Sequence, residues 1–142
     1  MARGGMMLSG LGRWSDASEL LMRLVVGGFL IWGVWDNITS DVRMAEFAGF
    51  LARWKFPFPE LMAPLSVWVQ FGCGAAFIAG ALTRWAGLLC ALHFIIAILM
   101  VDRFGGVRGA FPAAALVVIG LHLATAGPGR IAVDALFGGR RR

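Results

Sequence analysis

Four long apolar runs constrain the fold of this sequence more than any other feature. They cover about residues 18–37, 61–82, 84–102 and 110–126, and most charged residues fall between them. A helix needs about 20 largely apolar residues to cross roughly 30 Å of hydrocarbon. The 142-residue chain is 59% hydrophobic, whereas soluble domains are roughly 45–50% apolar. We therefore predict an all-α fold, a four-transmembrane-helix bundle in the lipid bilayer.

A further helix is expected at residues 41–55, between helices 1 and 2 of the bundle. Its apolar residues recur at spacings of three and four, at Met44, Phe47, Ala48, Leu51 and Trp54. The segment is too short and too charged to cross a membrane. We predict that it is a short interfacial amphipathic helix lying along the headgroup boundary.

The second and third apolar runs are separated by very few residues, 82–84. The two helices must therefore form an antiparallel hairpin, with Thr83 as a candidate N-cap of the third helix. Gly72, Ala76 and Gly80 stand four residues apart in the second helix. Small residues at this spacing let another helix approach closely, so they predict a packing face.

The chain divides into an N-terminal segment (1–17), the four-helix transmembrane domain (18–127) and a basic tail (128–142). Glu19 and Arg23 are expected to pair at i,i+4 at the headgroup level. Eight Arg lie on the side of the two termini and five Arg or Lys on the other. Because basic residues favour the cytoplasmic side, we predict a multi-pass protein with cytoplasmic N- and C-termini.

The net charge of +5 does not point to nucleic acid, since an apolar bundle offers no soluble basic face. Attraction to anionic lipid headgroups accounts for it more simply. The expected partners are the lipid bilayer and either another membrane protein or further copies of this chain.

Several short segments occur in a distinctive order. They are LMRL at 21–24, FAGFL at 47–51, FPFPE at 56–60, GALTR at 80–84, and GPGR at 127–130 followed by Asp134. Together they resemble the DoxX family of small four-helix bacterial membrane proteins. The family is named for a small subunit linked to a terminal quinol oxidase, and relatives are tied to thiosulfate oxidation or thiol-stress complexes. The resemblance implies the bacterial inner membrane and a non-catalytic accessory subunit of an oxidoreductase rather than an enzyme by itself.

Two positions depart from the family pattern. Asn37 stands where many members look to have Lys, and Gln70 stands where many have Glu. Both changes remove a charge. If those family positions meet as an ion pair, Asn37 and Gln70 are expected to meet here as two amides.

Polar groups inside the spans are costly in hydrocarbon and are therefore the candidates for a site. The candidate ligand-binding residues are His93, His122 and Gln70; further intramembrane polar residues are Cys73, Cys90, Asp36 and Asn37. A helical rise of about 1.5 Å per residue places the thiols and imidazoles in one layer of the cytoplasmic half. The thiols are expected to be buried packing residues, because reactivity needs ionisation.

Three readings of the histidines stay open. His93 or His122 donates a hydrogen bond to a quinone carbonyl, both hold a haem or metal ion, or each bonds a neighbouring helix and fixes packing. Two His alone are a weak ligand signal, so we predict no metal site and favour quinone over haem. No catalytic residues stand out. The alternative function is a non-enzymatic membrane scaffold or small-molecule carrier.

Overall fold

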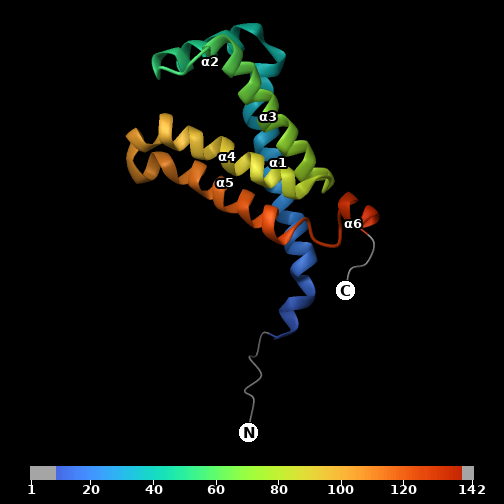
Figure 1. Ribbon diagram of the computed structural model, residues 1–142. Helices are drawn as coiled ribbons and strands as arrows, with labels where there is room; N and C mark the ends of the chain where they lie inside the picture. The colour runs from blue at the N-terminus through green and yellow to red at the C-terminus, as the bar shows by residue number, and fades with distance from the viewer. Residues whose placement is uncertain (1–8, 139–142) are drawn as a thin grey trace.

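The computed structural model describes residues 9–138, all of whose regular elements are helices (Figure 1). The helices are η1 (Ser9–Trp14), α1 (Ser15–Thr39), α2 (Asp41–Arg53), α3 (Pro59–Ala79), α4 (Thr83–Met100), η2 (Asp102–Gly105), α5 (Gly106–Ala126) and α6 (Val133–Phe137). The outer parts of the two predicted terminal segments, 1–8 and 139–142, lie outside the described residues. Helices α1, α3, α4 and α5 are long and apolar enough to cross a membrane, which confirms the predicted four-helix fold.

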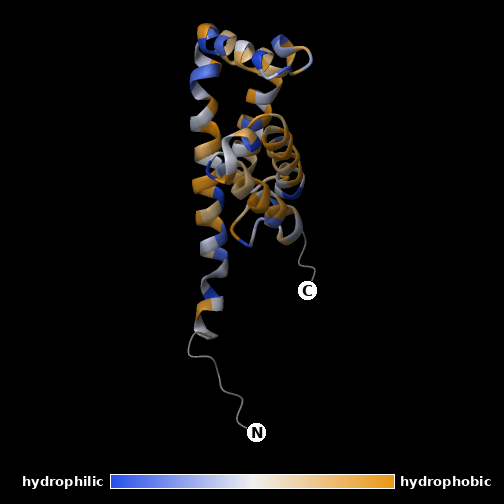
Figure 2. Ribbon diagram, turned by 90° about the vertical axis from the view of Figure 1, so that its left-hand side faces the viewer, coloured by the Kyte–Doolittle hydropathy of each residue, from blue (hydrophilic) through white to orange (hydrophobic). Residues whose placement is uncertain are grey.

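The four long helices form two antiparallel pairs. α1 packs against α3, and α4 packs against α5 (Figure 1). The α4–α5 pair crosses α1 and α3 at a steep angle, so it is seen nearly end-on in Figure 2, which colours the helices by hydropathy. One end of the bundle, here called the terminal end, carries the start of α1, the α3–α4 turn and the end of α5. The opposite end, called the α2 end, carries α2 and η2.

Helix α2 lies across its end of the bundle and buries the apolar side that the sequence predicts. Ala48 and Leu51 are buried against Ala63 of α3. Trp54, just after the helix, stacks on Phe104 of η2 with the ring centroids 5.4 Å apart. α2 is therefore held to both α3 and η2.

Glycines bring the helices of each pair into backbone contact, but they are not the glycines predicted. A Cβ added to Gly74 would lie 2.7 Å from the carbonyl oxygen of Gly27, and one added to Gly87 would lie 2.5 Å from that of Gly120. Gly72, by contrast, has open space where its Cβ would be. The prediction is therefore wrong for Gly72, whereas Ala76 packs against the core and the Cβ position of Gly80 meets Arg23 and Ala132. The small-residue spacing alone did not determine which side of α3 faces α1.

The α3–α4 turn also differs from the expectation. α3 ends at Ala79 because Gly80 adopts a left-handed conformation (φ +68°), as helix-ending glycines commonly do. Leu82, with φ +50°, occupies the N-cap position of α4 and makes no side-chain cap. Thr83 is instead the first residue of the helix, so the predicted Thr83 N-cap is wrong.

Candidate functional site

A partly open pocket of about 420 Å³ lies beneath α2, between α3 and α4. Its walls are mostly aromatic and aliphatic side chains. Four polar residues also line it, namely Ser66, Gln70, His93 and Asp102. Apolar walls with a few converging polar groups are the usual make-up of a small-molecule site. Two of the three predicted ligand-binding residues, His93 and Gln70, therefore lie at one pocket.

The polar contact inside this pocket joins two helices. Nε2 of His93 on α4 lies 3.4 Å from the hydroxyl oxygen of Ser66 on α3. This distance is long for a hydrogen bond to a hydroxyl, so the contact is weak. The half-buried imidazole also meets the ring of Phe94 edge-on. Sequence reasoning did not single out Ser66, although its place one turn before Gln70 on α3 puts both on the same side of that helix.

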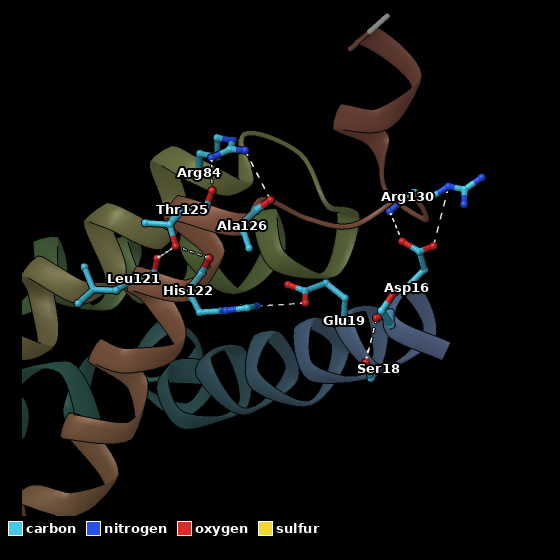
Figure 3. Close-up of polar contacts among 10 residues, drawn as sticks. Asp16, Ser18, Glu19, Arg84, Leu121, His122, Thr125, Ala126 and Arg130 are labelled. Atoms are coloured by element: carbon cyan, nitrogen blue, oxygen red, sulfur yellow. Dashed lines mark hydrogen bonds and ion pairs between the residues drawn. The ribbon is translucent and has the colours of Figure 1, made fainter. Parts of the chain in front are cut away.

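His122 lies elsewhere. Its Nε2 is 3.2 Å from a carboxylate oxygen of Glu19 on α1 (Figure 3). The structure thus does not bring the two imidazoles together, as a shared haem or metal ion would require. In residues 9–138, no group of three His, Cys, Asp or Glu is placed to hold a metal ion. The predicted pair of Glu19 with Arg23 does not form either, because Glu19 turns to His122.

The remaining predicted polar residues are spread over the fold. Cys73 and Cys90 are both buried in the core between the two helix pairs. Asp36 is exposed, and Asn37 donates its side-chain amide to the carbonyl of Arg43 in α2, 3.1 Å away. Since Gln70 lines the pocket, the expected meeting of Asn37 with Gln70 is wrong. Asn37 instead ties α1 to α2.

Arg23 has an importance that the sequence did not reveal. It is 0% exposed, and its guanidinium donates to the carbonyl of Phe77 on α3, 3.0 Å away, and to that of Ile131 after α5. An unpaired charge would be costly at such a site, but charge-assisted hydrogen bonds offset part of that cost. Arg23 thereby joins α1, α3 and the segment after α5.

That segment, residues 127–138, is called here the C-terminal strap. It folds back on the terminal end of the bundle. The backbone N–H of Arg130 donates to Asp16 of α1 at 2.9 Å, and the N–H of Asp134 donates to the carbonyl of Gly80 at 2.8 Å (the first contact is drawn in Figure 3). Beside the strap, Arg84 donates to the last carbonyls of α5, including that of Ala124 at 3.0 Å.

The carboxylate of Asp134 caps α4. It accepts hydrogen bonds from the backbone N–H groups of Leu82 (2.7 Å) and Thr83 (2.8 Å), groups that the start of a helix leaves without partners. Desolvation acts to raise the pKa of Asp134, but the bonds from Thr83 and Leu82 and the charge of Arg23 outweigh it, so the pKa lies below its ordinary range. The strap thus supplies the cap that Thr83 does not.

Replacing Asp134 by Asn should destabilise the fold by about 1 kcal/mol, because the amide keeps one acceptor oxygen and loses the charge and one of the two hydrogen bonds from the start of α4. Because the folded pKa is lowered, the carboxylate stabilises fully above pH about 4, where an unfolded Asp ionises, and this contribution is lost as the pH falls through the folded pKa. Denaturant unfolding in detergent micelles at several pH values measures the difference. Asp41→Asn, at the start of α2, is the control. A difference that does not shrink in acid would contradict this role.

Three of the five segments quoted above for the family resemblance meet in space, whereas the other two, 47–51 and 56–60, contribute Phe47, Phe50, Leu51 and Phe56 to the pocket. Hydrogen bonds that hold Arg23 and the strap in place come from residues 21–24, 80–84 and 127–130, together with Asp134. These three segments therefore build the terminal end of the bundle. They do not line the pocket.

Comparison with known proteins gives a family and no near relative. The family model described as DoxX matches residues 18–103. No curated protein and no solved structure matches the chain.

Proposed function

This chain belongs to the DoxX family, and we propose that it is an accessory subunit of a membrane oxidoreductase that holds a quinone in the pocket beneath α2. It is a multi-pass membrane protein by its four apolar helices. The accessory role rests on the family resemblance. The quinone rests on one observation, the His93–Ser66 contact within a mostly apolar pocket.

The pocket suits the chemistry of a quinone. A quinone head is a flat ring with carbonyl oxygens that only accept hydrogen bonds, and it carries an apolar tail. The imidazole N–H of His93, the hydroxyl of Ser66 and the amide of Gln70 are donors of the kind such carbonyls need. The aromatic side chains of Phe47 and Phe50 on α2 line the pocket, where they would cover the quinone ring. The open side of the pocket leaves room for the tail to reach the bilayer.

Each of these residues has a defined task in this proposal. His93 donates to one carbonyl in its neutral form, and the weak Ser66 contact is exchanged for the ligand at little cost. Gln70 orients the head from the neighbouring position on α3. A bound quinone supplies the oxidation and reduction chemistry, while this chain binds and orients it and keeps water out.

The proposed orientation places the terminal end in the cytoplasm, because Arg residues are in excess at that end and basic residues favour the cytoplasmic side. The pocket then lies toward the opposite, outer side of the bacterial inner membrane, because it is covered by α2. A partner membrane protein, or further copies of this chain, would pack against the exposed apolar faces of the bundle.

A second candidate function is a non-enzymatic scaffold or small-molecule carrier. The His93–Ser66 contact also favours it, because that contact already gives the imidazole a partner on a neighbouring helix. In this case the pocket holds an apolar molecule or lipid tail, and His93 only fixes the packing of α4 on α3.

Replacing His93 by Leu separates the two functions. If the imidazole binds a carbonyl, the affinity for decylubiquinone should fall about tenfold, which corresponds to one lost hydrogen bond. Titration of the protein in lipid nanodiscs measures it. His122→Gln is the matched control, since it changes the histidine outside the pocket and keeps a donor for Glu19. Unchanged affinity of the His93→Leu protein, with unfolding as in the wild type, would leave only the carrier or scaffold.

A further inference from the structure

Large apolar side chains are exposed where the C-terminal strap meets the α3–α4 turn. The exposed fractions are 85% for Phe137, 81% for Leu136, 73% for Trp85 and 70% for Leu82. A water-facing loop would not gather such residues without cost. The four side chains come from two segments that the Asp134 cap holds together.

The depth of these side chains in the membrane follows from where the spanning helices end. The strap begins where α5 ends, and the hydrogen bonds of Asp134 hold α6 at the point where α3 ends and α4 begins (Figure 1). Spanning helices end near the boundary between hydrocarbon and headgroups. Exposed apolar groups at this level therefore lie at that boundary, where Trp is also commonly found.

Positive charge accompanies them. The side chain of Arg130 is 90% exposed, and its Nε lies 3.9 Å from Asp16, a weak contact. In sequence, Arg140, Arg141 and Arg142 follow shortly after α6. The acid of the strap, Asp134, is directed at the N–H groups of α4. The exposed guanidinium of Arg130 can thus meet phosphate groups, which anionic lipid surfaces present.

We propose that residues 130–138 anchor the protein to anionic phospholipid. Leu136 and Phe137 enter the part of the acyl-chain region next to the headgroups, and Arg130 binds headgroup phosphate. The strap is then the counterpart of α2 at the other end of the bundle, a second element lying in the interface. This proposal does not depend on the quinone pocket.

Spin labels test the insertion. Nitroxides are placed at Leu136→Cys or Phe137→Cys in a Cys73→Ala, Cys90→Ala background that unfolds as the wild type does. In nanodiscs of phosphatidylcholine and phosphatidylglycerol, both labels should collide more often with oxygen, which is apolar, than with a water-soluble nickel complex. A label at Gly12→Cys, an exposed site in η1 with nothing near its Cβ position, should show the reverse. Leu136 and Phe137 labels that behave like the Gly12 label overturn the proposal.

Lipid retention tests the headgroup contact. Native mass spectrometry of the protein released from the same nanodiscs should show phosphatidylglycerol retained over phosphatidylcholine. Arg130→Gln should weaken this preference about fivefold, the effect of one cation near an anionic surface. Arg43→Gln, at the α2 end, is the control and should leave it unchanged. Equal retention of the two lipids by the wild type, or equal effects of the two substitutions, overturns the role of Arg130.

Discussion

Replacing Arg23 by Met is expected to release the C-terminal strap from the bundle. The substitution keeps an apolar stem of similar length but removes both donated hydrogen bonds, to Phe77 and Ile131. Hydrogen bonds from a charged donor contribute about 1.5–3 kcal/mol each. Since Nε of Arg23 has no partner among residues 9–138, part of that gain is already offset. We therefore expect a net loss of about 3 kcal/mol.

Trypsin provides the measurement for this release. The peptide bond after Arg130 is protected while the N–H of Arg130 is bonded to Asp16 and the carbonyl of Ile131 to Arg23. When opening is fast relative to cleavage, proteolysis follows the population of the open form. A loss of about 3 kcal/mol then accelerates cleavage at this bond by roughly hundredfold. Mass spectrometry of digests in detergent micelles identifies the fragment.

Two further variants control this experiment. Arg43→Met removes an exposed cation paired with Glu46 at 3.1 Å on α2, a pair worth at most about 1 kcal/mol, and should not change cleavage after Arg130. Arg23→Lys keeps the charge but cannot reach both carbonyls with one ammonium group, so it should fall between the wild type and Arg23→Met. Cleavage that is equally fast in the wild type and Arg23→Met would show that Arg23 does not hold the strap.

The helices could be predicted from the sequence because their signals are local. Apolar length identifies the spans, and the spacing of Met44, Phe47, Ala48 and Leu51 identifies the side of α2 that packs. The rotation of α3 about its axis depends instead on which residues of α1 lie opposite. For that reason Gly74, and not Gly72, contacts α1.

The candidate site could be predicted only in part, for a related reason. Polarity in an apolar run marks His93, Gln70 and His122 as unusual, but it does not say which neighbours they meet. The steep crossing of α4 and α5 over α1 makes distance along a helix a poor guide to depth (Figure 1). His93 consequently lies with Gln70 beneath α2, while His122 meets Glu19 at the terminal end. The sequence placed Arg23 at the headgroup level because the strap residue that it bonds, Ile131, lies 108 positions later in the chain.

Replacing Gly74 by Val should separate α1 from α3. The new Cβ would lie 2.7 Å from the carbonyl oxygen of Gly27, and a backbone oxygen in a helix cannot turn away as a flexible side chain can. Overpacking costs about 1–3 kcal/mol, and we expect the upper end of that range because backbone meets backbone. Unfolding by denaturant in mixed micelles measures the loss. Gly72→Val makes the same change two residues earlier, where the Cβ has open space, and should cost less than about 0.5 kcal/mol. Equal losses in the two variants would mean that the α1–α3 contact does not depend on Gly74.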